Sequence, residues 1–335
     1  MRKCMTIAAA AAAVLVCASG ARADFAFMDT VSVGNVGNAG ELSGVGAGGS
    51  GEDRICGAVG YAYNIGKYEV TAGQYTDFLN AVADTDTYEL YKTAMWENTT
   101  GCKIQRSGDP GGYTYSVAGD WADRPVNMVS FWSAARFANW LHNGRPAGAQ
   151  GPDTTEDGAY TLDGYTESDG SWIMRKPGAT WCIPSEDEWY KAAYYDGDAS
   201  IYYDYPTGTD AVPSNDLVDP DPGNNANFDQ DGFTIGHPYY RTEVGEFENS
   251  ASPYGTFDQG GNVWEWHDNV VYGSHRGSCG GGWYGDDTRL HAARRGASYP
   301  TTASIYTGFR VAYVPEPATL SLLLLGGFVV RRRRR

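Results

Sequence analysis

Three segments of the chain repeat apolar residues at the spacing of an α-helix. The first spans residues 72–83, AGQYTDFLNAVA. Its apolar positions are Tyr75, Phe78, Leu79 and Val82. Residues spaced i, i+3, i+4 and i+7 lie on one side of a helix, and Thr71 just before them is a preferred N-cap residue. The pattern predicts an amphipathic helix that begins after Thr71.

Two later segments each combine a short strand with a helix. Residues 125–144 (PVNMVSFWSAARFANWLHNG) predict a strand and then a helix that ends at Gly144. The inward positions of that helix are Phe131, Ala134, Ala135, Ala138 and Leu141. Residues 179–195 (ATWCIPSEDEWYKAAYY) predict a strand and then a helix in which Ser185 and Glu188 form a capping box.

Short strands are expected near both ends of the ordered chain, and loops dominate between the helices. The strand segments are residues 61–71, 261–271, 274–284 and 305–314. The loop segments, rich in Gly, Pro, Asn and Asp, are residues 84–125, 145–172 and 196–260. The sequence shows no internal repeat and no linker, so we predict one α+β domain that is loop-rich and low in regular secondary structure.

The first 23 residues have the layout of a secretory signal peptide. A charged start (MRK) precedes an apolar run, and Ala21-Arg22-Ala23 has the form of a cleavage site. Residues 24–57 follow, rich in Gly, Ala, Ser and Asn, and are expected to form a flexible N-terminal arm. The protein is therefore expected to be exported.

The C-terminal residues 314–335 combine a Pro-Glu-Pro motif, an apolar run and five arginines. The run from Ala318 to Val330 is shorter than the roughly 17–25 residues of a membrane span. This segment resembles the PEP-CTERM sorting tail of Gram-negative-type bacteria. The resemblance implies an exosortase-type protease as partner, transient membrane contact, and a final place on the cell-envelope surface or outside the cell. A permanently tail-anchored protein is the alternative.

The charge of the chain narrows the function classes. Residues 24–316 hold all 41 acidic residues but only 17 of the 25 basic ones, which gives a net charge near −24. Nucleic-acid binding is excluded, because phosphate contacts need basic patches. An acidic chain rich in Gly, Asp and Asn suits divalent cations, which prefer oxygen ligands.

Four cysteines remain after removal of the signal peptide: Cys56, Cys102, Cys182 and Cys279. An even number in an exported protein favours disulfides, and four cysteines allow three pairings. We predict Cys56 with Cys102, which flank the first helical unit, and Cys182 with Cys279. Two buried free thiols are the alternative for the second pair.

Six motifs in order resemble the formylglycine-generating enzyme family, also called sulfatase-modifying factor domains. They are IGKYEVTAGQYTDFLN, RPVNMVSFWSAARFANWL, IPSEDEWYKAA, YGTFDQGGNVWEW, RGSCGGGW and GFRVA. The resemblance covers residues 58–313 and implies a C-type-lectin-like α+β fold. The family's enzymes oxidise a sulfatase cysteine to formylglycine with copper(I) held by two cysteines, between the RGGSW-like strand and the GFR strand.

That window, Trp283 to Gly308, contains no cysteine here. Residues 284–289 (YGDDTR) stand where the pair would be, and Cys279 precedes the glycines of the strand. Soft thiolates select copper(I), whereas carboxylates and carbonyls do not. Copper is not expected, and the catalytic positions of the family are left without their cysteines.

The resemblance implies structural calcium sites. The first set is Asn262, Val263 and Glu265 in the Asn-Val-Trp-Glu motif, whose alternative is a strand in which Glu265 forms a salt bridge, for instance with Arg310. The second set is Asn227, Phe228 (backbone oxygen) and Asp231, whose alternative is an acidic turn. Another grouping, His267, His275, Cys279 and His291, has the donors of a transition-metal site but lacks local chelate spacing.

Aromatic and basic residues near the C-terminus predict a ligand groove: Trp283, Tyr284, Arg294, Arg295, Tyr299 and Tyr306. Such residues suit peptides or sugars, and the alternative is that the rings fill the domain's own interior. We therefore expect an exported, non-catalytic, calcium-stabilised module that binds peptide or polysaccharide. The competing hypothesis is a formylglycine-generating oxidase with an altered ligand set, Cys182 and Cys279.

Overall fold

The structure, a computed structural model, describes residues 26–315 and contains the three predicted helices. Helix α2 (Ala72–Val82) begins after Thr71, which forms a capping box with Gln74. Helix α4 (Phe131–His142) begins after Ser130, whose hydroxyl accepts from the Ser133 N–H. Helix α5 (Glu186–Tyr194) begins after Ser185 with the predicted Glu188 capping box. The helix predictions are confirmed, because the capping residue and the apolar stripe of each segment both indicate the same helix.

An antiparallel sheet joins distant parts of the chain in the order β1-β4-β14-β7. These strands are β1 (Thr30–Val33), β4 (Tyr63–Gly66), β14 (Ala312–Tyr313) and β7 (Trp181–Cys182). Ala312 is paired with Ile65 on one side and with Cys182 on the other. The sheet therefore ties both ends of the described chain to its middle.

A second sheet, in the order β12-β11-β10-β13, carries the motifs at the C-terminal end. Its strands are β10 (Trp264–Val271), β11 (His275–Cys279), β12 (Gly296–Ser298) and β13 (Thr307–Gly308). Strands β10 and β11 are antiparallel, with an irregular register between Trp266 and Val270. Strands β10 and β13 run parallel.

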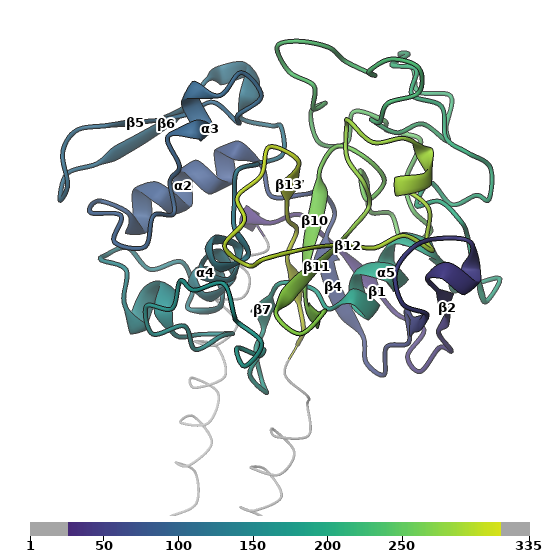
Figure 1. Ribbon diagram of the computed structural model, residues 1–335, viewed down its shortest axis with the longest axis horizontal. Helices are drawn as coiled ribbons and strands as arrows, with labels where there is room; N and C mark the ends of the chain where they lie inside the picture. The colour runs from purple at the N-terminus through teal and green to yellow at the C-terminus, as the bar shows by residue number, and fades with distance from the viewer. Residues whose placement is uncertain (1–25, 316–335) are drawn as a thin grey trace, which may run out of the picture.

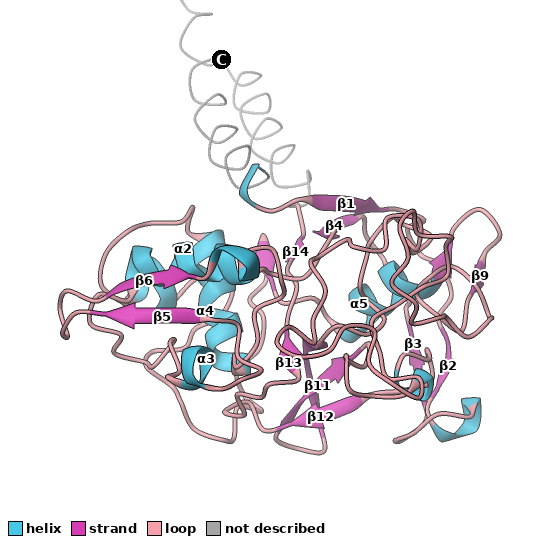
Figure 2. Cartoon of the chain, turned by 90° about the horizontal axis from the view of Figure 1, so that it is seen from above, coloured by secondary structure: helices cyan, strands magenta, loops and turns pink. Residues whose placement is uncertain are grey.

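Short elements flank these sheets on two sides (Figure 1). Helices α2 and α4 and the hairpin β5 (Ile104–Ser107)–β6 (Thr114–Val117) lie on one side of the second sheet, together with α3 (Ala94–Glu97). Helix α5 and the hairpin β2 (Glu41–Ser43)–β3 (Arg54–Cys56) lie on the other side. Figure 2 shows the same division from above, and the small hairpin β8 (Tyr195–Asp196)–β9 (Ile201–Tyr202) lies beyond α5.

Three local predictions are wrong. The described part of the predicted flexible arm, residues 26–57, forms β1, β2 and β3. Its composition does not indicate strands, but pairing of β1 with β4 and of β2 with β3 orders it. The hairpin β5–β6 lies in a segment predicted to be irregular. The segment directly before α4, residues 125–130, forms no strand: Pro125 makes a single bridge with Thr71.

Among the described residues, the buried apolar side chains form one large cluster and two smaller ones. The large cluster packs α2 and α4 against the first sheet, with Phe78, Phe137 and Phe309 in edge-to-face contact. A second cluster surrounds Trp189 on α5 and includes Cys56 and Cys279. Within residues 26–315, no helix has the length and apolar character needed to cross a bilayer. The predicted signal peptide and the apolar part of the sorting tail lie outside the described residues.

Candidate functional site

Five aromatic rings gather beside the C-terminal end of strand β11. We call this group the aromatic surface: Phe233, Tyr240, Trp283, Tyr284 and Tyr306. Trp283 is 5% exposed and forms its floor, while Phe233 and Tyr284 are 44% and 46% exposed at its rim. The Tyr284 and Tyr306 rings are stacked with centroids 4.4 Å apart. The group therefore presents apolar ring faces to solvent over a buried base.

Backbone hydrogen bonds fix the aromatic surface to the second sheet. The Trp283 N–H donates to the Asn262 carbonyl at 3.1 Å, and the Trp264 N–H donates to the Tyr306 carbonyl at 2.8 Å. The indole N–H of Trp283 is buried without a partner. Three aspartates lie close to the ring residues along the backbone: Asp229, which is bridged to Phe233, and Asp231 and Asp286, which are both exposed. The arrangement offers flat apolar faces with polar groups around them.

Half of the predicted groove residues belong to this surface. Trp283, Tyr284 and Tyr306 do, whereas Tyr299 stacks on His275, with centroids 4.1 Å apart. Arg295 binds Glu186 in a different cluster, and Arg294 is bonded through its backbone to His291. Phe233 and Tyr240, which complete the surface, were missed because they come from the loop region 196–260, where no periodicity marks a residue's neighbours.

The two predicted calcium sets meet each other rather than forming separate sites. The Asn227 side-chain amide donates to Asn262 Oδ1 at 2.9 Å, and the Asn262 N–H donates to the Asn227 carbonyl at 2.8 Å. Thr242 also donates to Asn262 Oδ1. The Phe228 carbonyl accepts from Asn215 and Thr234, and Asp231 is exposed in a turn. Asn227 Oδ1 is the one predicted calcium oxygen shown to be buried without a partner.

Glu265 takes part in a buried ion pair. Both of its carboxylate oxygens accept from Arg310, and Trp189 donates a further hydrogen bond at 2.7 Å. The side chains of Glu265 and Arg310 are both fully buried. The salt bridge, which the sequence offered as the alternative, is therefore what the structure contains, and calcium binding stays a prediction. Val263, the third residue of that set, is buried.

All four described cysteines are buried free thiols, so the predicted disulfides are not formed. Cys102 and Cys182 lie in the large core cluster, whereas Cys56 and Cys279 lie in the second cluster. Each predicted pair therefore joins residues of different clusters. Cys182 and Cys279, the altered copper pair of the competing hypothesis, likewise lie in different sheets: one in β7 of the first sheet, the other in β11 of the second.

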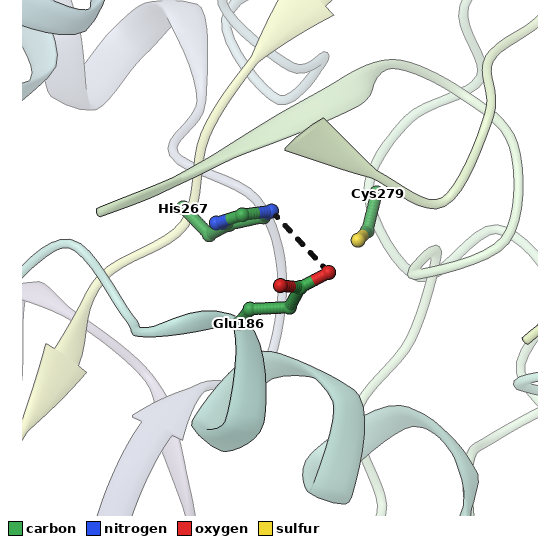
Figure 3. A group of neighbouring side chains, drawn as sticks. All are labelled: Glu186, His267 and Cys279. Atoms are coloured by element: carbon green, nitrogen blue, oxygen red, sulfur yellow. Dashed lines mark ion pairs between the residues drawn. The ribbon is translucent and has the colours of Figure 1, made fainter. Parts of the chain in front are cut away.

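One of these thiols, Cys279, belongs to a buried polar cluster. Glu186 at the start of α5, His267 on β10 and Cys279 at the end of β11 point toward one another (Figure 3). Their ligand atoms all lie within 4.8 Å of one another. Of the grouping considered from sequence, His267 and Cys279 meet here, while His275 packs on Tyr299 and His291 pairs with Asp204.

Two arginines and a second thiol surround this cluster. Arg54 and Arg295 bind the Glu186 carboxylate at 2.6 and 3.0 Å. Burial lowers the pKa of His267 to about 4, so the imidazole is neutral near pH 7. Burial also raises the pKa of Cys56 to about 12, with Glu186 acting in the same direction. Sequence spacing could not reveal the cluster, because Glu186 and Cys279 are 93 positions apart.

The stretch that holds copper in the family's enzymes has no soft donor here. Residues 284–289 supply aromatic, carboxylate and hydroxyl groups, and Asp287 Oδ2 accepts from the Tyr205 hydroxyl at 3.4 Å. Carboxylates and hydroxyls are poor ligands for copper(I). This stretch therefore does not fit copper(I).

Comparison with known proteins agrees with the sequence motifs. The family described as the sulfatase-modifying factor enzyme 1-like domain matches residues 58–314. Hercynine oxygenase of Mycobacterium tuberculosis is 24% identical over 277 residues, which cover 75% of this chain and 52% of that protein. The chain thus spans about half the length of this relative.

Two solved structures are similar to this chain, and the one with a TM-score above 0.5 shows the fold. Treponema denticola variable protein 1 has a TM-score of 0.52 at 18% identity, with 86% of this chain and 95% of that chain covered. The crystal structure of CarF has a TM-score of 0.49 at 21% identity, with 85% and 98% covered. The predicted loop-rich α+β fold class is confirmed.

Proposed function

Because the chain belongs to the family of sulfatase-modifying factor enzyme 1-like domains, we propose that it uses the family scaffold as a binding module rather than as an oxidase. The observation that carries the proposal is the aromatic surface, which includes Tyr284 from residues 284–289, the stretch where the resemblance places the family's copper-binding cysteines. Partly exposed rings over a buried base are suited to stacking on a ligand. The thiols, in contrast, are all buried elsewhere.

Polysaccharide is the ligand class that this surface favours. Sugar rings present flat C–H faces that stack on Tyr284 and Tyr306, and hydroxyl groups donate to carboxylates such as Asp231 and Asp286. The rim is acidic, so a neutral chain meets no electrostatic penalty, whereas an acidic polymer is repelled. With the expected secretion signal and sorting tail, the module would be exported and its tail processed by an exosortase-type protease. It would then act on the cell-envelope surface or outside the cell.

The test is binding of the chain to an array of neutral polysaccharides and, in parallel, to a peptide array. Tyr306→Ala should weaken polysaccharide binding by roughly 10–100-fold, because it removes a stacked ring at the centre of the surface. Tyr299→Ala is the control, since that tyrosine is also accessible to solvent, at 49% exposed, but packs on His275 outside the surface. Peptide binding that depends on Tyr306 would show that the ligand is a peptide and not a polysaccharide. The absence of Tyr306-dependent binding on both arrays would refute the binding module.

The oxidase hypothesis receives no support from the cysteines. A decisive assay incubates the chain with copper(I), oxygen and a cysteine-containing sulfatase-motif peptide, and follows conversion of the thiol to the aldehyde by mass spectrometry. The binding module predicts no conversion above the copper-only control. Conversion above that control would restore the oxidase.

A further inference from the structure

We propose that Glu186, His267 and Cys279 form a binding site for one thiophilic divalent transition-metal ion, with Zn²⁺ as its reference member. A carboxylate oxygen, an imidazole nitrogen and a thiol sulfur lie within 4.8 Å of one another. Figure 3 shows the three side chains converging from helix α5 and strands β10 and β11. The site goes beyond the proposed function and uses none of the residues of the aromatic surface.

The imidazole of His267 is the strongest indication that something is bound there. His267 is 0% exposed, and neither Nδ1 nor Nε2 has a hydrogen-bond partner. Its nearest charged group, Glu186 Oε1, lies 4.0 Å from Nε2. A buried polar group without a partner is costly, and such a group in a native structure calls for a ligand, an ion or a water.

The neighbouring strand is shaped around this ring. Gly277 on β11 lies against His267: a Cβ atom at that position would stand 2.0 Å from Cε1 and 2.2 Å from Nε2 of the imidazole. The backbone of Gly277 does not require a glycine for its dihedral angles, because its φ is not positive. The missing side chain is therefore explained by the space that the ring occupies.

The donor set selects the class of metal. Thiolate and imidazole ligands bind zinc and the ions of the later first transition series, whereas calcium and magnesium require oxygen ligands. Three protein ligands leave a fourth position of a tetrahedral ion open. Cys56 belongs to the same apolar cluster as Cys279 and is a further thiol for that position.

Metal binding need not change the total charge of the cluster, because protons can leave as the metal enters. Glu186 carries one negative charge, and Arg54 and Arg295 carry two positive charges. A divalent ion that displaces the thiol protons of Cys279 and Cys56 leaves the total charge unchanged. Both Nη atoms of Arg54 and Nε of Arg295 are buried without acceptors. The resulting thiolates would supply acceptors for these N–H groups.

The experiment titrates the full reduced chain, freed of metal by a chelator, with Co²⁺ and Zn²⁺. We expect one ion per chain, a sulfur-to-cobalt charge-transfer absorption, and release of two protons per Zn²⁺ by calorimetry in buffers of different ionisation enthalpy. Cys279→Ala and His267→Gln should each lower affinity by more than about 100-fold, beyond the 10–100-fold effect of an outer-shell partner. The matched controls, Cys102→Ala and His275→Gln, should leave affinity unchanged.

A second measurement needs no variant and so remains informative if the variants fail to fold. In the unaltered chain, Zn²⁺ should slow alkylation of Cys56 and Cys279 in mild denaturant without protecting Cys102 or Cys182, as read by mass spectrometry. Equal alkylation of all four thiols with and without Zn²⁺ would overturn the site. So would affinity that is unchanged by Cys279→Ala, or a Cys56–Cys279 disulfide in the protein as secreted.

Discussion

Glu265 and Arg310 form an ion pair that is closed to solvent on every side. Arg310 Nη2 donates to Glu265 Oε1 at 2.7 Å and Nε donates to Oε2 at 2.5 Å, while both side chains are 0% exposed. The same guanidinium donates to the Gly66 and Phe257 carbonyls. The pair therefore joins β10, the segment before β14, the end of β4 and the loop before β10.

Removing one member of this pair should be strongly destabilising. Glu265→Gln leaves the Arg310 charge buried without its counter-ion, and such changes cost about 3–5 kcal/mol. The free energy of unfolding, from denaturant titration, measures the loss. Glu89→Gln is the control: its pair with Lys92 is exposed, and exposed pairs contribute about 0–1 kcal/mol. A loss at Glu265 as small as that at Glu89 would contradict the prediction.

Calcium removal distinguishes two roles of Glu265, as partner of Arg310 and as calcium ligand. If Glu265 acts only through Arg310, a chelator should change the melting temperature of the wild type and of Glu265→Gln by the same amount. This expectation follows because both carboxylate oxygens are occupied by Arg310. A chelator effect present in the wild type and absent from the variant would show that Glu265 binds calcium.

The helices and their caps were predictable from the sequence, whereas the assembly of the site was not. Thr71 with Gln74 and Ser185 with Glu188 act within four residues, so local rules suffice. The first sheet instead pairs Ile65 with Ala312, which are 247 positions apart. No periodicity encodes such pairing, and the family motifs alone indicated that the distant strands belong to one fold.

The same limit explains why the disulfide prediction was wrong and why the ion pair of Glu265 was foreseen only as an alternative. A cysteine count favours disulfides, but pairing depends on which clusters the thiols enter, and Cys56 and Cys102 enter different ones. Glu265 stands in a motif whose likeness suggested calcium, while the partner that occupies it, Arg310, is 45 positions away. The sequence named Arg310 only as an alternative, because charge pairing in a core depends on tertiary contacts.

Glu69 should make the protein less stable as pH rises. Its side chain is buried, neither carboxylate oxygen has a partner, and burial raises its pKa well above 4.5, with Asp258 and Glu265 acting in the same direction. Above pH 4.5 the unfolded chain releases this proton while the folded chain keeps it, so the free energy of unfolding falls as pH rises toward the folded-state pKa.

Glu69→Gln should remove that dependence. Glutamine has nearly the same shape and no ionisation, so the variant should gain stability relative to the wild type from pH 5 to pH 8, with the gain increasing with pH. Melting temperatures at several pH values measure it, and Glu52→Gln, at an exposed position, is the control. A gain that shrinks as pH rises would show that the folded protein holds Glu69 ionised.

Gly277→Ala tests whether β11 is shaped around His267. The added Cβ would stand 2.0 Å from the imidazole, so either the ring or the strand must shift, and overpacking of this kind costs about 1–3 kcal/mol. Gly119→Ala is the control, because nothing lies within 4 Å of its Cβ position and its φ is not positive. That substitution should be neutral or stabilising by up to about 1 kcal/mol.

Adding His267→Ala to Gly277→Ala should recover part of the loss, since the obstructing ring is then gone. If the double variant is destabilised by the sum of the two single changes, the glycine serves the strand and not the ring.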